Sequence, residues 1–468
     1  MGQSLGEMLT SAGVITDTEL ETALERQKLY GGRLGANLIS MGFITRETLD
    51  TFLHHKPKRP ATLEDTGLPS AFISELALKI ASSLGTFTIG EVSKRIKLPS
   101  NIVDTTIQSL RQDKLCEVKG GAGFAPITYT FSITSAGRQR AAELIENNRY
   151  VGPAPVSLDD YTKAFDYQTA RNMFIPEERL REVFSPFILD DRIFEQFGPA
   201  VNSGKSIFIY GPAGNGKTAL AEAIGSLMGD EIYIPYSISV EREIINVFDP
   251  INHRELRSDG ENNLSSDERW VRCRRPIVLV GGELTLNMLD LEYNPAYKFY
   301  EAPLQLKANG GVFIIDDFGR QLVSPKHLLN RWIVPLERRT DFLTLHTGKK
   351  FEIPFEQLVV FSTNIEPHEL VDEAFLRRIR YKVKMDHPTK KDFADIFRLV
   401  CERNSIEFKP DVLDYLLKEY YEKKDVKLNS CHPRDLIDQI IDMAHFRNEK
   451  PALTKDAIDK AWNNYFVC

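Results

Sequence analysis

The stretch "SIFIYGPAGNGKTAL", which begins at Ser206, constrains the fold of this chain more than any other part of the sequence. Residues 206–210 predict a buried strand, and residues 211–218 have the spacing Gly-x4-Gly-Lys-Thr before a helical pattern. Glycines let backbone N–H groups turn towards a phosphate at the positive end of a helix. We therefore expect nine residues to bind a nucleotide: Gly211, Pro212, Ala213, Gly214, Asn215, Gly216, Lys217, Thr218 and Ala219.

The segment "GGVFIIDDFGR" supplies the acidic partner that a phosphate-binding loop requires. Four apolar residues, 312–315, predict a buried parallel strand that ends at Asp316 and Asp317. Paired carboxylates at such a position repel each other unless a cation lies nearby. We expect Thr218 and Asp316 to hold Mg²⁺ beside bound ATP, and Asp317 to polarise the attacking water.

Three later segments occur in a recognisable order: "LVVFSTN", which ends at Asn364, "DEAFLRRIRYKV" and "CHPRDLIDQIIDMA". Together with the two segments above, they resemble the AAA+ family of ATPases from residue 158 to residue 468. The resemblance implies that Asn364 orients the hydrolytic water. It also implies that Arg377 and Arg378 reach the γ-phosphate of a neighbouring subunit, with Arg380 as an alternative, and that Arg434 lies over the phosphates.

The predicted fold class is multidomain α/β, with a parallel sheet flanked by helices and a helical lid of four amphipathic helices at the C-terminal end. A small helical repeat domain and a winged helix precede this P-loop core. Proline-rich stretches mark the linkers. We expect a repeat domain at 1–56, a linker at 57–69, a winged helix at 70–148, a linker at 149–160, the core at 161–388 and the lid at 389–468.

Two departures from the AAA+ pattern affect the interpretation. Most relatives have Asp-Glu after the apolar strand, whereas this chain has Asp316-Asp317, which suggests slow, switch-like hydrolysis. The segment between Lys217 and Asp316 is also longer than a minimal core requires. We expect a hairpin at Gly281-Gly282 inside it and a second hairpin around Gly348. Its aromatic residues either grip a partner in a central channel or pack in the core: Tyr293, Tyr297, Phe299 and Tyr300.

Residues 70–134 read as three helices followed by a strand, a glycine-rich turn and a second strand, with the wing of the winged helix around Gly120 to Gly123. The presumed recognition helix, 100–115, carries Arg111 and Lys114 but also Asp104 and Asp113. A helix with no net charge neutralises few phosphates. A structural or protein-docking role is therefore favoured over DNA contact.

The first 56 residues hold two copies of one motif, which begin at Ser4 and Arg33, 29 residues apart. They resemble the N-terminal domain of type II secretion and type IV pilus assembly ATPases, whose tandem motifs bind cyclic di-GMP. The resemblance implies a regulatory site for this effector, with the glycine backbone exposed at its surface, at Leu5, Gly6, Gln27, Arg33, Leu34 and Gly35. Ser4 and Lys56 replace an Arg and a Gln of the motif. A docking module without ligand is the alternative.

Composition limits the setting in which the chain works. The net charge is -7, which argues against wholesale binding of nucleic acid, and no apolar run approaches the roughly 20 residues of a membrane span. Five scattered cysteines form no CxxC pair, and no leader pattern is visible. We expect a cytoplasmic protein.

The sequence leaves three functions open. The first is an ATPase, assembled as a homo-oligomeric ring, that remodels a protein substrate or a secretion- or pilus-type partner. The second is a DNA-directed ATPase that acts through the winged helix. The third is a scaffold that binds ATP, hydrolyses it negligibly and signals by assembly.

Overall fold

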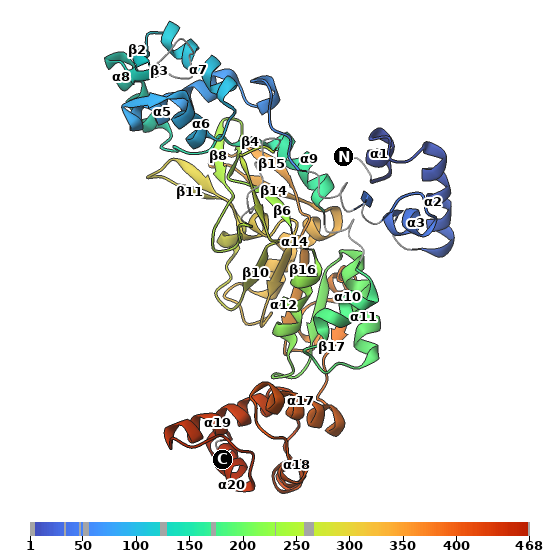
Figure 1. The fold of residues 1–468 in the computed structure, drawn as a ribbon. Helices are drawn as coiled ribbons and strands as arrows, with labels where there is room; N and C mark the ends of the chain where they lie inside the picture. Colours follow the sequence, from blue (N-terminus) through green and yellow to red (C-terminus); the bar gives the residue numbers. More distant parts are fainter. Residues whose placement is uncertain are drawn as a thin grey trace.

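The computed structural model describes residues 5–31, 34–45, 48–49, 56–121, 129–169, 175–229, 231–256 and 266–466. In Figure 1, helices α5 to α8 form one end of the molecule and helices α17 to α20 form the other, with the sheets between them. Among the helices of the described ranges, none combines the length and the apolar character that a membrane span requires.

The centre of the molecule is a parallel sheet of five strands in the order β10-β13-β16-β5-β17. Tyr210, at the end of β5, lies opposite Thr363 in β16, and Ile315 in β13 lies opposite Phe361. The carboxyl ends of these three strands therefore meet at one edge. The strands are β10 (Ile277–Val280), β13 (Val312–Ile315), β16 (Leu358–Thr363), β5 (Ile207–Tyr210) and β17 (Tyr381–Lys384).

Apolar helix faces cover both sides of this sheet. Helices α10 (Glu177–Phe184), α11 (Asp191–Ser203) and α12 (Lys217–Leu227) bury leucine, isoleucine and phenylalanine side chains against one side. Helix α14 (Pro325–Arg338) packs Leu328 and Trp332 against the other side. All four residues of β13 are fully buried, as its unbroken apolar run predicts for a central parallel strand.

A second, mixed sheet has the order β11-β12-β8-β7-β4 and is built largely from the long segment between Lys217 and Asp316. Two antiparallel pairs, β6 with β9 and β14 with β15, share its apolar core. The strands are β4 (Val156–Ser157), β6 (Ile232–Pro235), β7 (Ser237–Val240), β8 (Glu243–Asn246), β9 (Trp270–Cys273), β11 (Glu292–Asn294), β12 (Phe299–Glu301), β14 (Thr340–Thr344) and β15 (Lys350–Pro354).

The structure corrects one expected hairpin and confirms the other. The residues before Gly281-Gly282 form β10, which pairs in parallel with β13 at the edge of the central sheet, so no hairpin forms there. The β14–β15 hairpin is confirmed, with Gly348 in its turn. Of the four aromatic residues, Tyr300 is buried, and Tyr293 and Phe299 pack against apolar cores, whereas Tyr297 is 54% exposed. Core packing therefore accounts for three of the four.

Residues 70–147 fold into α5 (Ser70–Leu84), β1 (Thr86–Thr88), α6 (Ile89–Ile96), α7 (Ser100–Gln112), β2 (Cys116–Gly121), β3 (Tyr129–Ile133) and α8 (Ser135–Asn147). The three strands form an antiparallel sheet in the order β1-β3-β2, and all these elements share one apolar core. We call this unit the α5–α8 domain. The expected turn of the wing extends into residues 122–128, which lie outside the described ranges.

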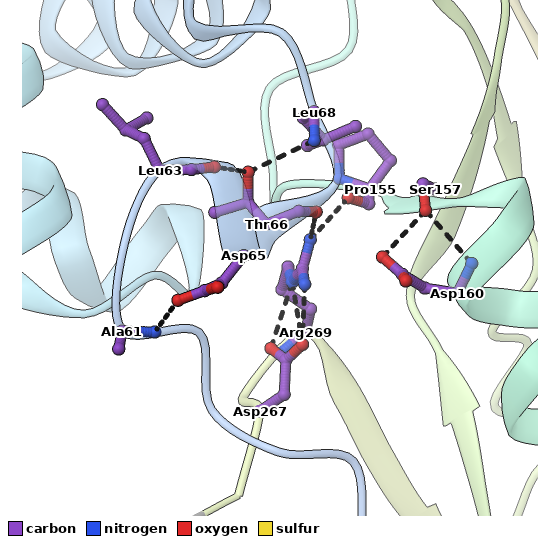
Figure 2. Close-up of polar contacts among 10 residues, drawn as sticks. All are labelled: Ala61, Leu63, Asp65, Thr66, Leu68, Pro155, Ser157, Asp160, Asp267 and Arg269. Carbon is purple, nitrogen blue, oxygen red and sulfur yellow. Dashed lines mark hydrogen bonds and ion pairs between the residues drawn. The ribbon is translucent and has the colours of Figure 1, made fainter.

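The two connections that flank the α5–α8 domain are anchored on the core by a buried arginine. Arg269 forms a salt bridge of 2.8 Å with Asp267, and both side chains are only 3% exposed. Its Nη1 also donates to the carbonyl oxygens of Thr66 (2.8 Å) and Pro155 (3.2 Å), as Figure 2 shows. Helix η1 (Glu64–Thr66) lies in the first connection, and β4 and α9 (Leu158–Gln168) begin in the second. Residues expected to be linkers thus pack against the second sheet.

Four helical segments follow the central sheet and enclose an apolar core of their own. They are α17 (Lys390–Arg403), α18 (Pro410–Leu416) with its π-helical continuation η5 (Leu417–Glu422), α19 (His432–Phe446) and α20 (Lys455–Tyr465). The periodicity of the sequence predicts helices at these places. We call this unit the lid.

The N-terminal helices α1 (Leu5–Ser11), α2 (Asp17–Tyr30) and α3 (Leu34–Ser40) pack as a separate small unit. Equivalent residues of the two repeats meet in its core, as the shared leucines and isoleucines predict: Leu9 and Leu38, Ile15 and Ile44. Helix α2 begins with a capping box between Thr16 and Glu19.

Candidate nucleotide-binding site

The loop between β5 and α12 turns tightly because its glycines adopt conformations that other residues avoid. Gly211 has a φ of 135°, and a Cβ atom there would lie 2.1 Å from the carbonyl oxygen of Met385. Gly216 has a φ of 77° and caps the N-terminus of α12. The N–H groups of the first turn of α12 therefore face the loop, where they can bind an anion.

Lys217 is folded back onto its own loop. Its side-chain Nζ donates to the carbonyl oxygens of Gly211 (2.9 Å) and Pro212 (2.8 Å), and the residue is 6% exposed. Burial lowers the pKa of this lysine, while the carboxylates of Asp316 and Asp317 act in the opposite direction. A phosphate group would replace the two carbonyl oxygens as the acceptor and would favour the charged lysine.

Thr218 and Asp316 meet across the carboxyl edge of the sheet. The Thr218 hydroxyl donates to Oδ2 of Asp316 at 2.8 Å, although 98 residues separate them in the chain. A hydroxyl and a carboxylate beside a phosphate-binding loop are the hard oxygen donors that Mg²⁺ prefers. The residues present therefore fit the metal ion that the sequence predicts.

Asp317 turns away from β13 towards the end of β16. Its φ of 48° lies in the left-handed region, which aspartate tolerates better than most residues. The turn is fixed by Phe318, whose N–H donates to the carbonyl oxygen of Ser362 at 2.7 Å. As a result, Nδ2 of Asn364 donates to Oδ1 of Asp317 at 3.0 Å. The two residues expected to handle water are thus brought together.

The lid is hydrogen-bonded directly to the phosphate-binding loop. The backbone N–H of Cys431 donates to the carbonyl oxygen of Gly214 at 2.8 Å, and the N–H of Ser430 donates to Oδ1 of Asn215 at 3.0 Å. Burial raises the pKa of the Cys431 thiol. These hydrogen bonds join the start of α19 directly to the loop.

A cavity of about 730 Å³ lies between the loop and the lid. All nine predicted loop residues except Gly211 and Pro212 line it, as do Asp316, Asp317, Asn364 and Arg434. Arg434 forms a salt bridge of 3.0 Å with its neighbour Asp435, which raises the pKa of the arginine. Apart from Gly211 and Pro212, the site residues predicted for a single subunit therefore border one space.

Sequence reasoning missed the wall of this cavity opposite the phosphate-binding loop. Apolar side chains from two distant segments form it, and Arg403 and Asn404 border it at the end of α17. Arg403 donates to the carbonyl oxygen of Pro186 at 3.2 Å, which ties the lid to the segment before α11. The apolar residues of the wall are Phe187, Ile188 and Leu189 from the segment before α11, and Ile396, Leu399 and Val400 from α17. The amphipathic pattern of α17 is the signal that could have identified its three residues.

Arg377 and Arg378 do not line this cavity. They precede β17, whose first residue, Tyr381, lies opposite Ile207 at the start of β5. The phosphate-binding loop follows the other end of β5, so the two arginines lie at the opposite edge of the sheet. Arg378 bonds to Glu337 at 2.5 Å, whereas Arg377 and Arg380 are exposed.

In the N-terminal unit, the repeat glycines are packed and not exposed as expected. A Cβ atom on Gly6 would lie 2.5 Å from Leu20 and 3.2 Å from Leu34, and one on Gly35 would lie 2.8 Å from Leu49 and 3.6 Å from Leu5. The contacts of the two glycines are thus related by pseudo-twofold symmetry. Gln27 lies on α2, whereas Arg33 and Ser4 fall outside the described residues.

Comparison with known proteins identifies one domain family and several solved structures. A family model described as a domain of unknown function (DUF8689) matches residues 389–464, which hold the lid. Among curated proteins, no significant match exists.

The similar solved structures share little sequence with this chain. NtrX from Brucella abortus in complex with ADP is 14% identical with a TM-score of 0.37, and the alignment covers 60% of this chain and 56% of NtrX. The RuvB Holliday junction branch migration motor of Thermotoga maritima is 15% identical with a TM-score of 0.34, covering 59% and 69%. Domain III of the replication initiation protein DnaA, from the same organism, is 15% identical with a TM-score of 0.37, covering 62% and 98%.

Proposed function

We propose that this chain is an ATPase of the AAA+ class, which hydrolyses ATP to ADP and phosphate and uses the cycle to remodel a macromolecular partner. The observation that carries the proposal is the cluster at the carboxyl edge of the sheet. There Thr218 contacts Asp316 at 2.8 Å and Asn364 contacts Asp317 at 3.0 Å. Both pairs border one cavity with Lys217.

Each residue has a distinct part in the proposed reaction. Lys217 leaves the loop carbonyls and binds the β and γ oxygens, while the N-terminus of α12 holds the phosphates. Thr218 and Asp316 would hold Mg²⁺, which when bound neutralises phosphate charge. Asp317 accepts the proton of the attacking water, and the amide of Asn364 fixes its carboxylate.

The lid completes the proposed site. The apolar wall from α17 and the segment before α11 suits a flat, weakly polar base, and Arg434 can leave Asp435 to reach the phosphates. Arg377, Arg378 and Arg380, at the other edge of the sheet, would serve the ATP of a neighbouring subunit. We therefore propose a homo-oligomer with head-to-tail contacts.

One contact favours a protein-remodelling ATPase over a DNA-directed one. Asn101, in the first turn of α7, donates to the carbonyl oxygen of Ala61 at 2.8 Å. The N-terminal residues of a recognition helix are the ones that normally contact base edges. Here the chain's own connection occupies that end of α7. We propose that the α5–α8 domain, as a winged helix, docks protein.

Titration calorimetry with ATP tests the proposed site. Lys217→Ala should reduce binding below detection, because it removes the only lysine of the loop. Lys205→Ala, a lysine just before β5 that does not line the cavity, is the matched control and should bind like the wild type. Equal affinity for the wild type and the Lys217 variant would refute the assignment.

For the N-terminal unit we propose a cyclic di-GMP sensor, on the basis of the repeats in register and their pseudo-twofold packing. A twofold surface suits a twofold dinucleotide. Calorimetry on the full chain in the Lys217→Ala background separates this site from the phosphate-binding loop. Weak binding that Ser4→Arg tightens about tenfold would support a sensor, because a bidentate arginine contact contributes on the order of 1–3 kcal/mol. No heat with either protein would indicate a docking module.

A further inference from the structure

A second cavity, of about 270 Å³, lies at the junction of the α5–α8 domain with the core. Helices α5 and α8 form one side of it, and the β7–β8 hairpin forms the other, so both units contribute to its wall. No residue of the proposed nucleotide site lines it. A ligand in this cavity would contact both units at once.

The cavity has an apolar part and a cationic part. Phe72, Leu76, Leu144 and Ile244 line it and are each less than 9% exposed. Three cationic residues line it as well: Lys79, Arg140 and Arg242. Glu75, the one acid among the lining residues, pairs with Arg242, and Arg140 pairs with Glu143, which lies outside the lining. Cations that outnumber their acids beside an apolar wall suit an amphiphilic anion.

Lys79 is the most buried of these charges. The residue is 5% exposed, and its recorded hydrogen bond, of 3.0 Å, goes to the carbonyl oxygen of Asn148. An ammonium group has three N–H donors. Burial lowers the pKa of Lys79 to about 8, against the opposite influence of Glu75. A bound anion would supply further acceptors and further negative charge to this buried ammonium group.

The turn that presents Arg242 is unusual for its residues. Glu241 and Arg242 have φ angles of 51° and 74°, in the left-handed region where hairpin turns usually have Asn-Gly. Arg242 is held at the cavity by Glu75 (3.2 Å), and Glu241 forms an ion pair with Lys349. The strained turn fixes a cation against the α5–α8 domain.

We propose that this junction cavity binds a small organic anion, in which a phosphate monoester or a carboxylate is attached to an apolar body. The anionic group contacts Lys79, Arg140 and Arg242, and the body packs against Phe72 and Leu144. At about 270 Å³ the cavity is smaller than sites for drug-sized molecules, which suits a single ring.

Titration calorimetry on the full chain, saturated with ADP and repeated in the Lys217→Ala background, tests the proposal. Phenyl phosphate and benzoate are the probes that distinguish the two head groups, and phenol is the neutral control. We expect one of the two anions to bind at one site per chain, and phenol to bind far more weakly. No heat with either anion, or equal affinity for phenol, would overturn the proposal.

Two variants locate the binding. Lys79→Met should weaken it at least about tenfold, since hydrogen bonds to charged groups are strong. Arg140→Gln, a change at a half-exposed position, should weaken it about threefold and decides the matter if the first variant fails to fold. Arg111→Gln, an exposed arginine of the same domain that does not line the cavity, is the control. The proposal would be overturned if Lys217→Ala removed the binding. It would also be overturned if the folded cavity variants, Lys79→Met or Arg140→Gln, bound the anion as tightly as the wild type.

The pH dependence gives an independent reading. Affinity should fall as the pH rises above about 8, because Lys79 loses its proton there. The other charged groups that face it from the cavity lining are Glu75, Arg140 and Arg242. Constant affinity from pH 7 to pH 10 would show that Lys79 does not contact the anion.

Discussion

Asp317 combines a backbone requirement with a chemical one. Its left-handed conformation, with a φ of 48°, carries the chain from β13 towards Asn364. Asparagine and aspartate tolerate the left-handed region because their short side chains can hydrogen-bond to the nearby backbone. The longer side chain of glutamate does not provide this stabilisation. The backbone therefore offers a physical reason for aspartate, and not glutamate, at position 317.

We expect Asp317→Glu to lower the free energy of unfolding by on the order of 1 kcal/mol, while Asp317→Asn leaves it nearly unchanged. Thermal unfolding of the ADP-free protein measures both. Asp411→Glu, an exposed residue at the start of α18, controls for the added methylene group. Equal melting temperatures for the two Asp317 variants would remove the backbone argument.

At the scale of the element, close packing in the α5–α8 domain depends on one helical glycine. A Cβ atom on Gly137, in α8, would lie 2.0 Å from the carbonyl oxygen of Leu115, which is backbone and cannot rotate away. Gly137→Ala should therefore destabilise this domain by about 1–3 kcal/mol, despite the better helix propensity of alanine. The Cβ atom of Gly90→Ala, in α6, would meet only the hydroxyl oxygen of Thr88, at an ordinary contact distance of 4.0 Å, so this change should be neutral or stabilising. Denaturant unfolding that ranks the two variants in the reverse order would contradict this packing.

Elements with a local signal were predictable from the sequence. The lid helices could be predicted from their periodicity, and β13 from its unbroken apolar run, because both signals depend on neighbouring residues only. The phosphate-binding loop could be predicted from the spacing of the residues around Lys217, which is also local. The position of β10 was not predictable, because each of its residues pairs with a β13 residue 35 positions further along the chain, and because Gly281-Gly282 looks like a hairpin turn. The same holds for Arg269, whose carbonyl partners are 203 and 114 residues distant, and for the apolar wall of the nucleotide cavity.

At the scale of the whole molecule, the arginines before β17 and the phosphate-binding loop lie at opposite edges of one sheet. Four-residue strands such as β5 and β17 span roughly 13 Å, so Arg377 and Arg380 cannot reach the γ-phosphate of their own subunit. If these arginines act on the ATP of a neighbouring subunit, turnover per chain should rise with protein concentration. Concentration-independent turnover by a monomer in light scattering would contradict the proposed assembly.

Mixing two inactive variants tests the same point. Lys217→Ala cannot bind ATP, and Arg378→Ala with an intact loop lacks the arginine offered to its neighbour. A mixed oligomer contains interfaces in which an intact loop faces an intact arginine, so some activity should return. In the control mixture, Arg111→Ala replaces Arg378→Ala. Because Arg111→Ala keeps both the loop and the arginines, this mixture should show only the activity of the Arg111→Ala protein.

The most direct test of the account is phosphate release from ATP by the wild-type chain and by Asp317→Asn, at equal and saturating ATP. We expect slow but measurable release by the wild type, and a loss of at least about hundredfold in the variant with ATP binding retained, because the variant keeps the loop and lacks the base. Turnover that is the same in both proteins would contradict the assignment of Asp317. No release by the wild type at any concentration would identify the chain as a scaffold that binds ATP without hydrolysing it.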